Sequence, residues 1–188
     1  MLQKFDGQNV YAILRAPRAP STEAIVLSTP YRAPESAHGS TMPSVALMLA
    51  LAKYFSTKSY WAKDIIFLVG DYELVGIQAW LMSYHDMGRS LSTVLDYGTL
   101  DGVSGPIQAA INLEIHGVRN SRLQLKIEGL NGQLPNLDLF NVVVELATRE
   151  SVPPTFHGYS HPYTIDQWES WKQYALTTGT LEYSESLL

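Results

Sequence analysis

Two acidic residues, Asp71 and Glu114, are the best candidates in this sequence for metal chemistry. Both lie at the carboxyl end of a predicted strand, where open α/β sheets bind their ligands. Carboxylate oxygens there could hold a divalent cation and lower the pKa of a bound water. Zinc sites usually take three or four protein ligands, so two carboxylates alone favour a helix-capping or solvent-facing role. A metal site on this pair is the less favoured alternative.

The histidines do not complete such a site. His157 and His161 are four residues apart, a spacing that suits a metal only on a helix. Gly158 and the neighbouring prolines predict a loop, where positions i and i+4 do not share a face. His116 follows Glu114 but points to the opposite face of a strand, because side chains alternate along a strand.

The sequence also shows no pattern typical of a catalytic serine or of a nucleotide-binding loop. The serine in Gly102-Val-Ser-Gly105 lacks the pattern of a nucleophile elbow and does not lie between a strand and a long helix. No glycine-rich loop follows a strand to bind phosphate. The 188 residues contain no cysteine, and a net charge of −5 argues against nucleic acid as a partner.

The elements that must position Asp71 and Glu114 alternate between strand and helix. Short apolar runs predict strands, and longer stretches that begin with a capping residue or proline predict helices. The predicted strands are 9–15, 24–28, 64–70 and 108–115, and the predicted helices are 43–55 and 73–84. This order predicts an α/β fold with a mixed, mostly parallel sheet and helices on both faces. Helix 43–55 is apolar almost all round, so we expect it to be deeply buried, as we do strand 108–115.

The pattern weakens toward the end of the chain. Residues 122–128 predict a strand at an edge, and residues 135–149 predict an amphipathic helix. We expect residues 1–150 to form one domain and residues 151–188 to be a weakly patterned, partly loose continuation of it. Residues 165–176 could form one further helix. The apolar stretches are too short to cross a membrane.

Three longer stretches carry a resemblance to a known family. They are Gly7-Gln-Asn-Val-Tyr-Ala-Ile-Leu-Arg-Ala-Pro-Arg-Ala-Pro20, Tyr60-Trp-Ala-Lys-Asp-Ile-Ile-Phe-Leu-Val69 and Glu128-Gly-Leu-Asn-Gly-Gln-Leu-Pro-Asn-Leu-Asp-Leu139. The third is physically a turn that leads into a helix. Its particular letters, with the other two at compatible spacing, resemble the luminal domain of the GPI-anchor attachment protein family, a subunit of GPI transamidase.

This resemblance implies a fold similar to that of the two-zinc aminopeptidases. The metal ligands and the general base of those enzymes correspond to four places in this sequence. The His-x-Asp pair of such enzymes falls at Pro30-Tyr-Arg32, the bridging Asp near Ser40, the paired Glu at Gly70-Asp71 and the last acid at Glu114. Most ligands and the general base are therefore replaced. The resemblance thus implies a non-catalytic protein with no cofactor, and the alternative is an active metal-dependent aminopeptidase or amide-bond-forming enzyme.

The resemblance also implies a cellular setting. The family works on the luminal side of the endoplasmic reticulum membrane, with other transamidase subunits, the GPI lipid and the precursor protein as partners. Its members are membrane-anchored on both sides of this region, so we expect this chain to be a C-terminally incomplete fragment without its membrane helices. Within the turn, Asn131, Gln133 and Asn136 are the candidate partner-binding residues, because exposed loops on a rigid scaffold often carry contacts.

Overall fold

The computed structural model describes residues 6–31, 41–86, 95–115, 123–125, 137–152, 154–156 and 159–160. The chain divides into two compact units, residues 1–118 and residues 119–188. Each unit has its own sheet, and each is described by itself.

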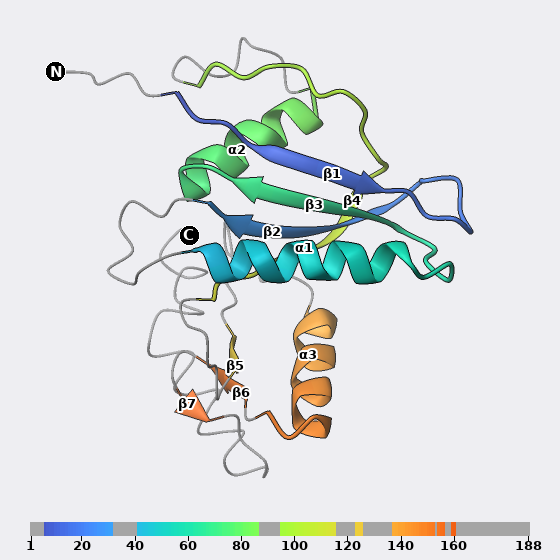
Figure 1. Ribbon diagram of the computed structural model, residues 1–188, viewed down its shortest axis with the longest axis vertical. Helices are drawn as coiled ribbons and strands as arrows, with labels where there is room; N and C mark the ends of the chain where they lie inside the picture. Colours follow the sequence, from blue (N-terminus) through green and yellow to red (C-terminus); the bar gives the residue numbers. More distant parts are fainter. Residues whose placement is uncertain are drawn as a thin grey trace, which may run out of the picture. The chain divides into compact units, whose positions relative to one another are not determined.

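The first unit is built on a four-stranded sheet (Figure 1). Its strands are β1 (Val10–Leu14), β2 (Ala24–Pro30), β3 (Asp64–Gly70) and β4 (Ile107–Asn112), in the spatial order β1-β3-β2-β4. Strand β2 runs parallel to both β3 and β4, whereas β1 joins β3 antiparallel. The prediction of a mixed, mostly parallel sheet is therefore confirmed. The finer likeness to zinc aminopeptidases stays a prediction.

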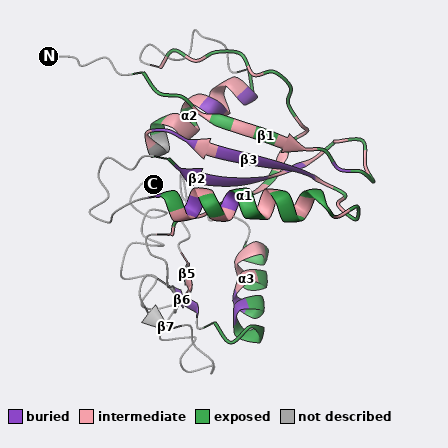
Figure 2. Ribbon diagram, in the orientation of Figure 1, coloured by how far each residue is buried: buried purple, intermediate pink, exposed green. Residues whose placement is uncertain are grey.

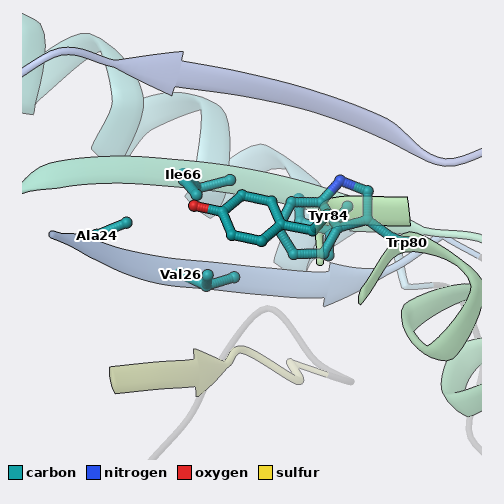
Figure 3. Close-up of a cluster of buried hydrophobic side chains, with 6 residues drawn as sticks. Ala24, Val26, Ile66, Trp80 and Tyr84 are labelled. Atoms are coloured by element: carbon teal, nitrogen blue, oxygen red, sulfur yellow. The ribbon is translucent and has the colours of Figure 1, made fainter. Parts of the chain in front are cut away.

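Helix α2 (Glu73–Tyr84) covers one face of this sheet. Alternate residues of β2 and β3 point toward it, because successive side chains of a strand face opposite sides. Figure 3 shows the Trp80 and Tyr84 rings against the aliphatic side chains of the two strands. The buried members of this cluster are Ala24, Val26, Ile66, Leu68, Trp80 and Tyr84.

Helix α1 (Met42–Ser56) covers the other face. Its buried Met48 packs with Leu27, Ile65 and Phe67, the strand residues of opposite parity. The prediction of helices on both faces is therefore confirmed. The predicted deep burial of this helix is wrong, because only Ser44 and Met48 are buried in it and Leu49 is 65% exposed. A helix on a sheet buries one stripe, whatever the composition of its other side; Figure 2 marks its exposed residues in green.

Strand β4 also differs from its prediction. We expected a buried strand, but partly buried and exposed residues alternate along it. Its place at the end of the strand order β1-β3-β2-β4 explains the difference, since an edge strand is less covered by its neighbours than a central one. Its first residues are joined to β2 with a register irregularity between Ala24 and Ile25.

The described residues of the second unit form a smaller sheet and one helix. Strand β5 (Leu123–Leu125) lies at the edge of this sheet, parallel to β6 (Pro154–Phe156), which pairs antiparallel with β7 (Tyr159–Ser160). Helix α3 (Leu137–Arg149) buries Val144 and Ala147. Strands β6 and β7 were not predicted, and the helix considered for residues 165–176 lies outside the described residues.

Among the residues that the structure describes, no helix combines the length and the apolar character needed to cross a membrane.

Candidate functional site

The carboxyl ends of the three parallel strands meet at one edge of the first sheet. Pro30 at the end of β2 is paired with Gly70 at the end of β3, and Ser28 is paired with Asn112 at the end of β4. The topology therefore brings the segments that follow these strands to the same edge, as the sequence predicted. What each segment can do there depends on its hydrogen bonds.

The segment after β2 is used to attach the sheet to helix α1. The backbone N–H of Tyr31 donates to the Gly70 carbonyl oxygen at 2.7 Å. The Thr41 hydroxyl, just before α1, donates to the Tyr31 carbonyl oxygen at 2.5 Å. Pro30 offers no side-chain ligand, while Arg32 and Ser40 lie outside the described residues.

Asp71, directly after β3, is buried and holds the backbone around it. Its carboxylate accepts hydrogen bonds from the backbone N–H of Gln8 at 3.3 Å and of Tyr72 at 3.1 Å. Tyr72 starts α2 in a left-handed conformation with φ of 56°, unusual for a residue with a side chain. Asp71 is only 2% exposed. Its carboxylate thus links the segment before β1 to the start of α2.

Asn9 completes this arrangement on the other side of the turn. Its side-chain oxygen accepts the backbone N–H of Asp71 at 3.0 Å, and its side-chain amide donates to the Gly76 carbonyl oxygen at 2.7 Å. Both ends of one amide group therefore bind the segment from Asp71 to Gly76, which leads into α2 and forms its first turn. No local pattern distinguishes Asn9 in the sequence, because its partners lie more than sixty residues away in the chain.

Glu114 lies in a different environment from Asp71. It is exposed, and one of its carboxylate oxygens accepts a hydrogen bond from the Asn112 side-chain amide at 2.8 Å. Strand β2 lies between β3 and β4, so the backbones that carry the two acids are separated by about 10 Å, two strand spacings. Within the described part of the chain, no three His, Cys, Asp or Glu side chains form a group that could hold a metal ion.

A buried serine ties the end of β4 to α1. The Ser44 hydroxyl is 2.6 Å from the backbone N–H of Ile115, from which it accepts, and it donates to the carbonyl oxygen of the same residue at 3.3 Å. Thr29 of β2 donates to the Leu113 carbonyl oxygen at 3.0 Å. Small hydroxyl residues therefore hold this edge together. No sequence pattern distinguished Ser44 and Thr29 from other residues of a buried strand or helix.

The opposite edge of the sheet carries a second polar cluster, centred on Asp64 at the start of β3. This fully buried carboxylate accepts from the Arg15 guanidinium at 2.9 Å, the Ala16 backbone N–H at 2.7 Å and the Ser104 hydroxyl at 2.7 Å. The Arg15 side chain is about half exposed. The serine excluded above as a nucleophile therefore helps to hold a structural ion pair.

The pKa of Asp64 reflects both burial and these donors. Burial by itself raises the pKa of this carboxyl group, but hydrogen bonds from Ala16, Ser104, Arg15 and Ser21 outweigh it, so the pKa lies below its ordinary value of 3.8. Tyr84 lies nearby and donates from its hydroxyl to the Gly105 carbonyl oxygen at 2.8 Å. Burial raises the pKa of Tyr84.

The remaining predicted site residues are not described. Asn131, Gln133 and Asn136 lie outside the described residues, as do His116, His157 and His161. The partner-binding assignment in the turn before α3 therefore stays a prediction. His85 follows α2 and is exposed.

Known proteins are similar to this chain over most of its length. A family model described as "Gaa1-like, GPI transamidase component" matches residues 6–183, which include both units. The chain belongs to this family. Two relatives agree: "GPI transamidase component gaa1" of Schizosaccharomyces pombe is 35% identical over 159 residues, and "GPI transamidase component GAA1" of Saccharomyces cerevisiae is 30% identical over 154 residues.

The alignments cover most of this chain but a small share of each relative. They include 83% and 81% of the chain, and 26% and 23% of the fission-yeast and budding-yeast proteins respectively. The Gaa1-like chain thus spans about a quarter of the length of these relatives. The identical residues support the assignment to the family, and the activity of the whole protein is a separate question.

Proposed function

We propose that this chain is part of a non-catalytic subunit of a GPI transamidase complex, which supports the attachment of GPI anchors to precursor proteins. The observation that carries the proposal is the family match over residues 6–183, together with two relatives named as components of GPI transamidase. In the proposed reaction, the precursor loses a C-terminal signal peptide, and its new carboxyl end forms an amide bond with an amine of the GPI lipid.

The chemistry of the described residues supports a non-catalytic role. The 188 residues contain no cysteine, so a thiol nucleophile would have to come from outside them. Asp71 is buried and accepts backbone hydrogen bonds, and Glu114 is exposed beside Asn112 with β2 between the two acids. A water-activating metal needs ligands that converge on one point, usually three or more from the protein.

The proposed setting is the luminal side of the endoplasmic reticulum membrane. The other transamidase subunits would be the direct partners, and the GPI lipid and precursor protein would be met through the assembled complex. We propose that Asn131, Gln133 and Asn136 contact a partner, because they lie in the stretch that carries the family resemblance.

Loss of the acidic residues tests the non-catalytic role. The protein that contains this chain would be expressed in cells that lack their own Gaa1-like component, with Asp71→Asn and Glu114→Gln combined. We expect the surface level of GPI-anchored proteins, relative to the amount of assembled complex, to equal that of the wild type. Stoichiometric zinc in the purified wild-type protein, lost in the double variant together with anchoring at unchanged complex assembly, would establish the metalloenzyme alternative instead.

Substitutions in the turn test the partner surface. We expect Asn131→Ala with Asn136→Ala to reduce co-purification of the other subunits while the melting temperature of the purified chain is unchanged. Asn141→Ala on the exposed side of α3 is the matched control, because it removes the same group at an exposed position. A lower melting temperature with full co-purification would mean that the turn serves only to support its own helix.

A further inference from the structure

The side of α1 that faces away from the sheet is apolar and exposed. Met42, Leu49 and Tyr54 are 58%, 65% and 53% exposed, and their spacing places them on one side of the helix. Ala46, Ala50 and Lys53 are also exposed on this side, so the face is apolar apart from one lysine. Exposed apolar side chains grouped on one face mark a contact surface rather than a fully solvated one.

The charge of this region is opposite to that of the chain. From Thr41 to Lys63 the sequence contains no Asp or Glu and three Lys, although the whole chain has a net charge of −5. Lys63 forms an ion pair with Glu23. Lys53 and Lys58 form no ion pair with an acidic residue in the part of the chain that the structure describes. Lys53 on the exposed face of α1 and Lys58 just after the helix are thus available to an anionic partner.

Aromatic side chains accompany these lysines. The Lys58 ammonium group lies 4.8 Å from the ring centroid of Tyr54. Tyr60 is 54% exposed and lies against Trp61, with 5.0 Å between ring centroids. The Trp61 indole N–H donates to the Phe55 carbonyl oxygen at 3.1 Å, which fixes this aromatic pair at the end of α1.

A shallow hollow lies beside these residues. Its volume is about 220 Å³, and its lining includes Arg15, Ser56, Thr57, Lys58, Ser59 and Trp61. The lining combines hydroxyl groups, one indole ring, the Lys58 ammonium group and Arg15, whose guanidinium is paired with Asp64. Such a lining suits a phosphate-bearing head group next to an apolar phase, where lysine and aromatic side chains place a polar end in water and an apolar body below it.

We propose that the outward side of α1 and the residues up to Tyr60 form a membrane-contact surface for bilayers with anionic phospholipid head groups. Leu49 and Met42 would enter the outer part of the bilayer, while Lys53 and Lys58 contact phosphate groups. Charge favours this occupant, because residues 41–63 carry three Lys and no acidic residue within an acidic chain, and an anionic bilayer attracts such a segment. The contact needs no other subunit, so it goes beyond the proposed role in the complex.

Vesicle binding tests the proposal directly. The purified 188-residue chain would be sedimented with vesicles of phosphatidylcholine alone, or of phosphatidylcholine with about 30% phosphatidylserine, a strongly anionic surface. We expect binding to the anionic vesicles, weaker at higher salt because the head-group charges are screened. Equal binding to both vesicle types, or no binding to either, would overturn the proposal.

Single substitutions locate the surface. We expect Lys58→Gln to weaken binding about fivefold, from about 1 kcal/mol for each cation near an anionic membrane. Arg149→Gln on α3 removes the same charge from the other unit and should leave binding within twofold of wild type. Leu49→Ser should weaken binding further at any salt concentration, since it removes buried apolar area. Circular dichroism melting would show whether these variants fold as the wild type does.

Two outcomes would point to a different explanation of the binding or a different partner for this surface. If Arg149→Gln weakens binding as much as Lys58→Gln, net charge and not this surface causes the binding. The second outcome is that the chain shows no vesicle binding, while the double variant Lys53→Glu, Lys58→Glu loses another transamidase subunit from the purified complex. In that case the surface is a protein contact. Co-purification of the subunits together with absent vesicle binding would overturn this proposal and leave the proposed function standing.

Discussion

Strand β3 begins with a buried aspartate, Asp64, and is followed directly by another, Asp71, and the two residues are held in different ways. Asp64 at the start accepts from the Arg15 guanidinium as well as from a backbone N–H and a hydroxyl group. Asp71 at the end accepts from the backbone N–H groups of Gln8 and Tyr72. One carboxylate is neutralised by Arg15, which directly follows the neighbouring strand β1, and the other stabilises a turn.

The difference indicates what each edge of the sheet does. At the amino edge, the charge of Asp64 contributes to the stability of the fold, because its partners are more favourable than the water that it has lost. At the carboxyl edge, where an enzyme of this topology would leave its acids free to bind ligands, Asp71 is committed to the backbone. Four substitutions or titrations test this contrast.

The largest effect is expected from Gly105→Ala at the amino edge. A Cβ atom at Gly105 would lie 1.8 Å from the Thr22 carbonyl oxygen, so the backbone of the loop next to Ser104 must move. We expect a loss of at least about 3 kcal/mol in the free energy of unfolding, at the upper end of overpacking effects. Urea denaturation measures it, and Gly98→Ala is the matched control because nothing lies within 4 Å of that position. Equal stability of the two variants would contradict the close approach.

Asp64→Ala comes next, with an expected loss of about 3 kcal/mol. The substitution leaves the Ala16 N–H buried without its acceptor and removes the charge partner of Arg15. The loss should lie at the low end for a buried ion pair, because the half-exposed Arg15 side chain can reach water. Chemical denaturation at pH 7 is the measurement. A loss below that of Asp71→Ala would reverse the proposed ranking of the two edges.

Asp71→Ala is expected to cost about 1–2 kcal/mol, the range for hydrogen bonds left unmade at a buried polar site. The variant should retain the α/β fold by circular dichroism and lose stability only, because Asn9 still holds the turn through Asp71 N–H and Gly76. Metal analysis of wild type and variant accompanies the melt. Bound zinc that disappears with the carboxylate would mean that Asp71 is a ligand and not a turn residue.

The smallest effect is a pH dependence that Asp64→Asn should remove. Because the pKa of folded Asp64 lies below its ordinary value of 3.8, this residue contributes stability above the unfolded-state pKa. The contribution is lost as the pH falls through the folded-state pKa. The difference in unfolding free energy between wild type and Asp64→Asn should therefore shrink as the pH falls from 7 toward about 3. A constant difference over this range would contradict the assigned shift.

The sequence predicted those parts of the fold that depend on local pattern. The bounds of β3 and α2 match their predictions. For β3 the reason is a continuous run of β-branched and apolar residues that is bounded by Asp64 and by the glycine turn at Gly70. Parallel pairing followed from the alternation of strands and helices. The strands β6 and β7, three and two residues long, gave no such pattern beyond the proline pair 153–154.

Features that depend on contacts far apart in the chain could not be predicted in the same way. The apolar composition of α1 shows which residues could be buried, but not whether another element covers the outer side of the helix. The sequence therefore did not predict that this side is exposed. The edge position of β4 is set by strand order rather than by its own residues. Arg15 and Asp64 are 49 residues apart, and no local spacing links an arginine after one strand to an aspartate that begins another.

The antiparallel course of β1 has a mechanical consequence. Just before the strand, Gln8 donates to Asp71, and just after it, Ala16 donates to Asp64, so β1 is fastened at both ends to the two ends of β3. A tension applied to residue 6 along the strand would load the whole β1–β3 ladder in shear, so that its bonds resist together rather than opening one by one. A pull at the N-terminal side would therefore reach the centre of the sheet before β1 could peel away.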